Sequence, residues 1–279
     1  LWVNKQFREL GDVIFVGEVD ELKRIELRDA VLHIGAGASL EAAWRALAQR
    51  HPTLTDVWLR FAAPPIRNAG TMGGNVANGS PIGDCAPVLL ALDAQIELRK
   101  GSRVRRMELH EFYVDYMKNR LEPGEFVQGL RIPAAPSARQ VRAYKISKRF
   151  DCDISALCVG FAIELDASVV KQIRLAYGGM AGIVKRAANA EAALLGKPWT
   201  EAALGAAQDA LTSDFTPLTD MRASAGYRMQ VAKSLLQRFW LETRPAAPLD
   251  PSVTSVWSVM PHEPLDPGLR RDGSVGVPA

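Results

Sequence analysis

The stretch IRNAGTMGGNVANGSPIGDCAP, residues 66–87, has an unusual composition for a globular protein. It contains five glycines, several hydroxyl and amide side chains, and no lysine. Glycine lets a backbone approach a ligand closely, and successive backbone amides can hold an anion without a cationic side chain. A loop that packs only on itself is the alternative, but ordering so many glycines is entropically costly. The stretch therefore predicts a ligand site in which Asp84 accepts hydrogen bonds from sugar hydroxyls.

Composition limits the classes of protein to which the chain can belong. With 279 residues, 48% hydrophobic and 23% charged, it is typical of one large or two small globular domains. A net charge of +3 is too small to indicate nucleic-acid binding, and no apolar run predicts a membrane span or a signal peptide. Three cysteines without a C-x-x-C pair argue against a disulfide framework, a structural zinc or an iron–sulfur cluster. They indicate a reducing, cytoplasmic compartment.

Hydrophobic periodicity predicts an α+β fold, and the order of the predicted elements changes after Pro123-Gly124: strands and helices are mixed before it, and strands are followed by helices after it. In the first half it predicts strands over 12–17, 31–36, 93–99 and 102–108, and helical segments over 39–50, 85–92 and 109–120. In the second half it predicts strands over 125–132, 140–148, 155–165 and 169–177, then helices over 182–195, 200–212 and 217–242. We expect domains over residues 1–133 and 138–242, followed by a flexible tail over 243–279.

The segment HIGAGASLEAA, residues 33–43, places a Gly-x-Gly turn between a predicted strand and a predicted helix. Dinucleotide-binding folds begin in this way. The third glycine of that fingerprint is missing, because Leu40 occupies its position, and no βαβ unit follows. The segment is therefore interpreted as a tight turn from strand to helix.

The longer segment RFAAPPIRNAGTMGGNVANGSPIGDCAPVLLALDA, residues 60–94, resembles the second FAD-binding loop of the molybdenum hydroxylase flavoproteins. Xanthine dehydrogenase and carbon monoxide dehydrogenase belong to that family. The matching positions are Ile66, Arg67, Asn68, Thr71, Gly73, Gly74, Asn75, Ser80, Pro81, Asp84 and Pro87. Residues 143–155 resemble the strand and loop beside the flavin ring, and residues 173–199 resemble the family's C-terminal domain. The small subunit of bacterial xanthine dehydrogenase is the variety that it resembles most.

The resemblance implies an α+β fold of two subdomains that grip FAD, followed by a sheet-and-helix domain. The FAD-binding residues that it implies are Phe61, Thr71, Gly74, Asn75, Asn78, Asp84, Val127 and Lys145. Lys145 matches a lysine near the edge of the flavin ring, where a cation stabilises negative charge on reduced flavin. Its alternative role is that of an exposed strand lysine. The charged residues Arg149, Asp151 and Asp153 match a loop that borders the nicotinamide site, and no side chain is implied as a nucleophile, general base or metal ligand.

Two parts of the family pattern have no counterpart in this sequence. The chain begins at Leu1-Trp2-Val3, where relatives have just completed an A-G-G-T-D-type loop that also holds the FAD pyrophosphate. The iron–sulfur domain that precedes it is likewise missing, so we expect the chain to be the C-terminal part of a longer subunit. The resemblance places 2Fe–2S clusters on other segments or chains, and the molybdopterin on a large partner subunit.

The resemblance implies that FAD passes electrons from iron–sulfur clusters to NAD⁺ in a xanthine dehydrogenase-like enzyme. A flavin-free fragment that only docks on a partner is one alternative. A nicotinamide-dependent enzyme that uses the turn in residues 33–40 is another. Flavin absorbance after FAD is added separates the first function from the other two.

Overall fold

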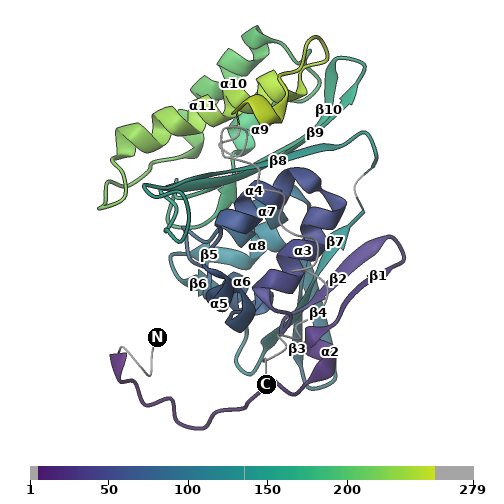
Figure 1. Ribbon diagram of the computed structural model, residues 1–279, viewed down its shortest axis with the longest axis vertical. Helices are drawn as coiled ribbons and strands as arrows, with labels where there is room; N and C mark the ends of the chain where they lie inside the picture. Colours follow the sequence, from purple (N-terminus) through teal and green to yellow (C-terminus); the bar gives the residue numbers. More distant parts are fainter. Residues whose placement is uncertain (1–5, 135, 255–279) are drawn as a thin grey trace, which may run out of the picture.

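The computed structural model describes residues 6–134 and 136–254. Each half of the chain contains an antiparallel sheet together with helices that cover it (Figure 1). Along the long axis the layers alternate: C-terminal helices, a four-stranded sheet, the helices of the first half, and a five-stranded sheet. The predicted α+β class is therefore confirmed.

The five-stranded sheet belongs to the first half. In spatial order its strands are β1 (Ile25–Arg28), β2 (Val31–Gly35), β7 (Phe126–Pro133), β3 (Gln95–Lys100) and β4 (Arg103–Glu108), all antiparallel to their neighbours. Side chains alternate between the faces, so Leu32 and Ile34 are buried while His33 lies half-buried on the other face. Helices cover the face that carries Leu32 and Ile34.

The helices of the first half are short. They are α2 (Asp20–Lys23), α3 (Leu40–Arg50), η1 (Pro52–Leu54), α4 (Thr55–Arg60), α5 (Pro64–Ala69), α6 (Met72–Asn78), α7 (Cys85–Ala91) and α8 (Leu109–Phe112). The glycine-rich stretch thus forms α5, α6 and a turn before α7 instead of one open loop. Thr71 caps the start of α6 by accepting from the amide of Gly74, and Gly79, with φ of 62°, ends it.

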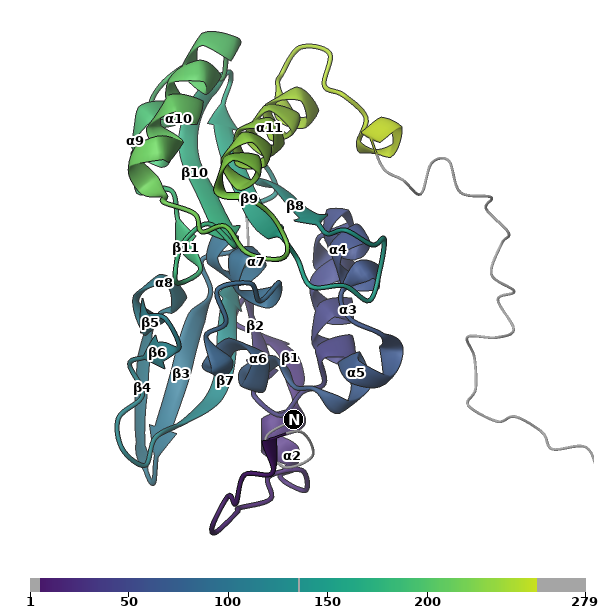
Figure 2. The same ribbon diagram turned by 90° about the vertical axis from the view of Figure 1, so that its left-hand side faces the viewer.

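The second sheet is buried on both faces. Its strands in spatial order are β11 (Lys185–Arg186), β10 (Val169–Gly178), β9 (Leu157–Asp166) and β8 (Gln140–Ile146). Helices α9 (Ala188–Leu194), α10 (Glu201–Asp214) and α11 (Ala225–Thr243) cover one face, and α7 packs against the other (Figures 1 and 2). The approach of α7 is so close that a Cβ on Gly160 would lie 2.4 Å from the carbonyl oxygen of Pro87.

Four of the predicted elements differ from the structure. The strand predicted over 12–17 is wrong: among the described residues no strand pairs with this segment, and Val13 to Val16 are exposed. Strand β1 was not predicted and takes its place against β2. The helix predicted over 109–120 ends at Phe112, and the chain continues into the small hairpin of β5 (Tyr113–Asp115) and β6 (Lys118–Asn119).

The other two differences lie in the second half. The helix predicted over 182–195 begins only at Ala188, because β11 first pairs with β10. The helix predicted over 217–242 begins at Ala225, where Ser224 caps it, so residues 216–224 form a loop. The remaining predicted helices and strands are confirmed to within a few residues at their ends.

The predicted tail over 243–279 is only partly described. Residues up to 254 run back beside α11 and end in η2 (Pro251–Thr254). The amide of Leu249 donates to the carbonyl of Leu241, and Thr254 donates to Glu242 at 3.2 Å. The rest of the tail lies outside the described residues.

Two negative findings concern only residues 6–134 and 136–254. Within these ranges no helix combines the length and hydropathy that a bilayer span requires. The same ranges contain no group of three or more histidine, cysteine or acidic side chains arranged to hold a metal ion.

Candidate functional site

A cavity of about 360 Å³ opens where the two halves of the chain meet. The corner between α4 and α5, the end of α6 with the turn after it, and the loop before β9 form its walls. The lining residues are Phe61, Ala62, Ala63, Ile66, Asn75, Asn78, Ser80, Ile82, Gly83, Asp84, Cys152, Asp153, Ile154 and Ser155. Apolar side chains thus share the wall with amides, hydroxyls and carboxylates, which suits a ligand that has a flat apolar part and a polar part.

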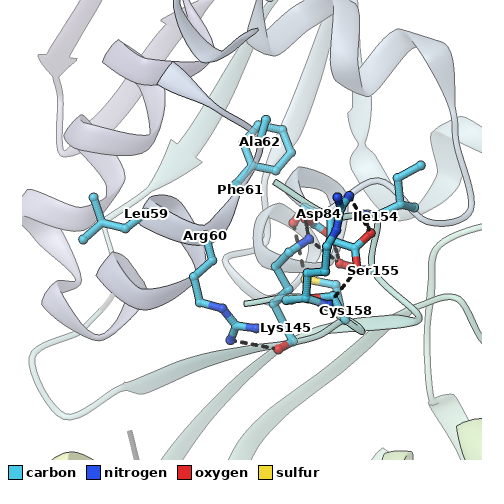
Figure 3. A network of polar contacts seen from close by, with 12 residues as sticks. Leu59, Arg60, Phe61, Ala62, Asp84, Lys145, Ile154, Ser155 and Cys158 are labelled. Carbon is cyan, nitrogen blue, oxygen red and sulfur yellow. Dashed lines mark hydrogen bonds and ion pairs between the residues drawn. The ribbon is translucent and has the colours of Figure 1, made fainter. Parts of the chain in front are cut away.

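Asp84 is the most strongly bonded carboxylate of this wall (Figure 3). Its Oδ2 accepts from Nζ of Lys145 at 2.6 Å, and its Oδ1 accepts from the hydroxyl of Ser155 at 2.6 Å. Nζ of Lys145 also donates to Oγ of Ser155 at 2.7 Å, which closes a triangle of three groups. Lys145 reaches this point because alternate residues of β8 face the first half of the chain.

All three members of the triangle are buried. The exposed fractions of Asp84, Lys145 and Ser155 are 4%, 2% and 1%. A buried ion pair needs further hydrogen bonds to offset the loss of hydration, and here the Ser155 hydroxyl supplies them to both charges. Removing either charged partner would leave the other uncompensated in a region of low dielectric.

Two buried cysteines lie beside this triangle. Burial, followed by the nearby charge of Asp84, raises the pKa of the thiols of Cys85 and Cys158 well above the usual value. Sγ of Cys158 lies 3.9 Å from the carbonyl oxygen of Asp84. Both thiols are therefore protonated at neutral pH and serve as packing groups, because only a thiolate is an effective nucleophile.

The corner between α4 and α5 is held by a buried arginine. Nη1 of Arg67 donates to the carbonyls of Phe61 at 2.9 Å and of Ala62 at 3.1 Å, and its Nε pairs with Glu41 at 2.6 Å. Burial opposes ionisation of Glu41, but hydrogen bonds, first from Arg67, bring its pKa below the usual value. The arginine of the I-R-N motif thus shapes one wall of the cavity while its guanidinium stays behind that wall.

The loop over residues 147–154 forms the opposite wall and is tied to α4. Nη1 of Arg60 donates to the carbonyl of Lys145 at 3.1 Å (Figure 3). Its Nε donates to the carbonyl of Phe150 at 2.8 Å. Within the loop, Asp153 accepts from the backbone amides of Arg149 and Ile154. These bonds, the one from Arg149 first, lower the pKa of Asp153, so this carboxylate is ionised and serves to fix the turn.

The structure brings only some of the implied FAD-binding residues to the cavity. Phe61, Asn75, Asn78 and Asp84 line it, and of the three loop residues so does Asp153. The others lie elsewhere: Thr71 and Gly74 at the start of α6, Val127 in the core on β7 beside Leu98 of β3, Lys145 behind Asp84, and Arg149 and Asp151 on the exposed side of the loop.

The backbone amides of both glycine segments are used inside the protein. At the start of α6 the amides of Met72 and Gly73 donate to the carbonyls of Ala38 and Ala36, and that of Gly74 donates to Thr71. A Cβ on Gly73 would lie 2.3 Å from the Cβ of Ala36, so this glycine permits close packing. The expected concavity of free amides is therefore not formed by these three residues.

The turn after β2 is used in the same way. The amides of Gly35, Ala36 and Gly37 donate to the carbonyls of residues 24, 128 and 22. None of these three amides is directed at a ligand, so the interpretation of this segment as a tight turn is confirmed.

Several residues of the cavity were not among the FAD-binding residues that the resemblance implied. They are Ala62, Ala63, Ile66, Ser80, Ile82, Gly83, Cys152, Ile154 and Ser155. A signal was present for Ser155, because it is the polar residue that directly precedes the apolar run of β9, the strand beside Lys145. The small residues Ala62 and Ala63 carry no such signal, since their place in the wall depends on the carbonyl contacts of Arg67.

Comparison with known families shows the family to which the chain belongs. Residues 1–135 match the FAD binding domain in molybdopterin dehydrogenase, and residues 142–243 match the CO dehydrogenase flavoprotein C-terminal domain. The chain belongs to the molybdenum hydroxylase flavoproteins. It is an oxidoreductase component that contains an FAD-binding domain and a flavoprotein C-terminal domain.

Individual relatives agree with this assignment. The chain is 32% identical over 251 residues to a xanthine dehydrogenase of Emericella nidulans, and this alignment covers 85% of this chain and 18% of that protein. It is 28% identical over 247 residues to the putative xanthine dehydrogenase FAD-binding subunit of Escherichia coli K12, and this alignment covers 88% of this chain and 84% of that subunit. The flavoprotein chain thus spans about a fifth of the fungal enzyme.

A solved structure supports the fold directly. The carbon monoxide dehydrogenase of Hydrogenophaga pseudoflava superposes with a TM-score of 0.74 at 28% identity, over 78% of this chain and 77% of that one. In that structure the enzyme lacks the Mo-pyranopterin moiety of its molybdenum cofactor.

The residues of the cavity fit part of FAD. Phe61, Ile66 and Ile154 provide an apolar surface for a ring, while Asn75 and Asn78 provide donors and acceptors for a polyol or a phosphate. Asp84 accepts hydrogen bonds only, so it suits a hydroxyl and opposes a phosphate. The cavity therefore has the chemistry required for a flavin ring and its ribityl chain.

Proposed function

We propose that this chain carries electrons through FAD in a xanthine dehydrogenase-like molybdenum hydroxylase. Iron–sulfur clusters on other segments or chains deliver the electrons, and NAD⁺ accepts them from the reduced flavin. A purine such as xanthine is oxidised at the molybdopterin of a large partner subunit, as part of purine catabolism in the cytoplasm. The relatives named xanthine dehydrogenase in fungi and bacteria support this reaction class.

One observation carries the proposal to this chain. A carboxylate fixed by two partners, Asp84, lies on a cavity wall that also has aromatic, aliphatic and amide side chains. A nucleotide phosphate alone would be repelled by that carboxylate, and a purely apolar ligand would leave the remaining acceptor positions of its oxygens unpaired. A flavin with a hydroxylated chain satisfies both parts of the wall.

The chain contributes position and environment to the reaction. FAD, when bound, supplies the redox chemistry, and no side chain of the cavity is required as a nucleophile or base. Phe61, Ile66 and Ile154 exclude water from the ring, and Asp84 orients the ribityl hydroxyls. Lys145 acts on the flavin through Asp84, because its ammonium group already pairs with that carboxylate. Arg149 and Asp151 lie on the exposed rim, where they border the entry of NAD⁺.

The first experiment measures flavin retention. The purified chain is incubated with FAD, freed of excess cofactor, and its visible absorbance is recorded. We expect a stoichiometric flavin spectrum, and reduction of this flavin followed by addition of NAD⁺ should return it to the oxidised form. Binding of NAD⁺ by a chain that takes up no flavin would exclude the proposed function.

A flavin-free docking fragment is the second candidate. It is favoured by the amides of Met72, Gly73 and Gly74, which are satisfied without any ligand, so that α6 is complete by itself. This candidate predicts a folded, cooperative and colourless protein that still associates with the large subunit. The same absorbance measurement, together with co-purification of that subunit, distinguishes the two.

A further inference from the structure

Ser155 has no role in the function described so far, yet it is one of the three groups of the buried triangle and is bonded to both of the others. It lies two residues before β9, lines the cavity and is 1% exposed. Its hydroxyl donates to Oδ1 of Asp84 and accepts from Nζ of Lys145 (Figure 3). A hydroxyl has one donor, so the donor of Ser155 is fully used on the carboxylate.

The two oxygens of Asp84 are therefore held independently. Oδ2 is bonded to Lys145 and Oδ1 to Ser155, and both partners come from the second half of the chain whereas Asp84 comes from the first. Two bonds to different oxygens fix the rotation of a carboxylate, which a single ion pair with a flexible lysine does not. Each oxygen retains a second acceptor position that can face the cavity.

We propose that Ser155 is a positioning residue of the flavin site. It fixes the plane of the Asp84 carboxylate so that the free acceptor positions meet hydroxyl groups of the ligand. The inference rests on the proposed function, because it needs FAD as the ligand. It also explains why a serine lies two residues before a strand that begins with an apolar run.

The test is a double-mutant cycle on FAD affinity in the complete polypeptide that carries these residues. Ser155→Ala should raise the Kd for FAD about tenfold, the effect of losing one hydrogen bond to a charged group. Asp84→Asn should raise it further, and adding Ser155→Ala to Asp84→Asn should change Kd by less than about twofold, because Ser155 acts through Asp84. Ser147→Ala is the matched control, since the Ser147 hydroxyl donates to the Arg149 carbonyl in the same loop and lies outside the cavity wall.

Each result decides between outcomes. Wild-type affinity in Ser155→Ala, or effects of the two substitutions that simply multiply, would overturn the positioning role while leaving the proposed function in place. A wild-type polypeptide that binds no FAD would overturn the proposed function and this inference together. If the Tm of Ser155→Ala lies within a few degrees of that of the wild type, its weaker binding does not come from a misfolded domain. If Asp84→Asn fails to fold, the Kd of the single variant Ser155→Ala still tests the positioning role.

Discussion

Asp84 and Lys145 are 61 residues apart in the sequence, and their pairing makes each depend on the other. The motif around Asp84 and the family resemblance of residues 143–155 around Lys145 each indicate a functional position. Neither pattern shows that the two side chains meet, because contact between distant segments depends on how α7 packs on β9 and β10. The resemblance implied that Lys145 lies at the edge of the flavin ring. In the structure its ammonium group pairs with Asp84 and supports that carboxylate.

The first consequence concerns stability. Lys145→Met removes the ammonium group but keeps the aliphatic stem, and leaves Asp84 buried without its counter-charge. We expect the free energy of unfolding to fall by about 3 to 5 kcal/mol, measured by urea denaturation. Lys118→Met is the control, because Lys118 pairs with Asp115 at 3.6 Å on the exposed surface, and should cost less than about 1 kcal/mol. Equal effects in the two variants would show that the buried pair contributes no more than the exposed one.

Among the elements, the corner between α4 and α5 depends most on one side chain. The carbonyls of Phe61 and Ala62 point at the guanidinium of Arg67, and Ala62 has a φ of 50°, which non-glycine residues seldom adopt. Both residues line the cavity. The shape of this wall is thus set by a buried cation that itself remains outside the cavity.

Arg67→Lys tests this dependence on a planar, forked donor. Lysine keeps the positive charge, but its single ammonium nitrogen cannot contact Glu41 and the two carbonyls at once, so we expect a loss of about 2 kcal/mol of unfolding free energy and weaker FAD binding. Arg45→Lys serves as control, because Arg45 contacts the same Glu41 at 3.3 Å from the exposed side. A control that is as destabilised as Arg67→Lys would assign the effect to the Glu41 pair instead of the carbonyls.

The elements also show how far sequence patterns reach. Helices with a full apolar face and a capping residue, such as α3 and α10, could be predicted, as could the long strands of the second sheet. The sequence alone could not show that the strand expected over 12–17 is absent. A strand needs a neighbouring strand for its backbone hydrogen bonds, and hydrophobic periodicity does not show whether one is there. The same limit applies to the cavity, where Phe61 and Asp84 were identified by a motif but Ile154 and Ser155 reach it only through the fold.

On the scale of the whole molecule, α7 connects the two sheets. One core includes Val88, Leu89 and strand residues of the first sheet, and extends to Ala143, Cys158 and Ala176 of the second sheet. Asp84 immediately precedes α7, so this cavity-lining carboxylate is attached to the helix that joins the halves. The position of the Asp84 carboxylate relative to the second sheet is therefore set by how closely α7 packs.

Gly160→Ala tests that packing. Its new Cβ would meet the backbone carbonyl of Pro87 at 2.4 Å, which cannot move without shifting α7. We expect a loss of about 1 to 3 kcal/mol, the usual effect of overpacking, measured as a lower urea midpoint. Gly205→Ala in α10 has open space around it and should instead stabilise the protein by about 0.5 to 1 kcal/mol. A stable Gly160→Ala variant would show that the contact between α7 and β9 is loose.

The position of α7 has a practical consequence for anyone who divides this protein into parts. The two family domains meet between residues 135 and 142, yet α7 belongs by sequence to the first and packs against β9 and β10 of the second. Cutting the chain there would uncover the apolar side of α7 and one whole face of the second sheet. The boundary at which two sequence patterns join is therefore a poor place to cut the protein, and chimaeras with related flavoproteins should exchange α7 together with the sheet that it covers.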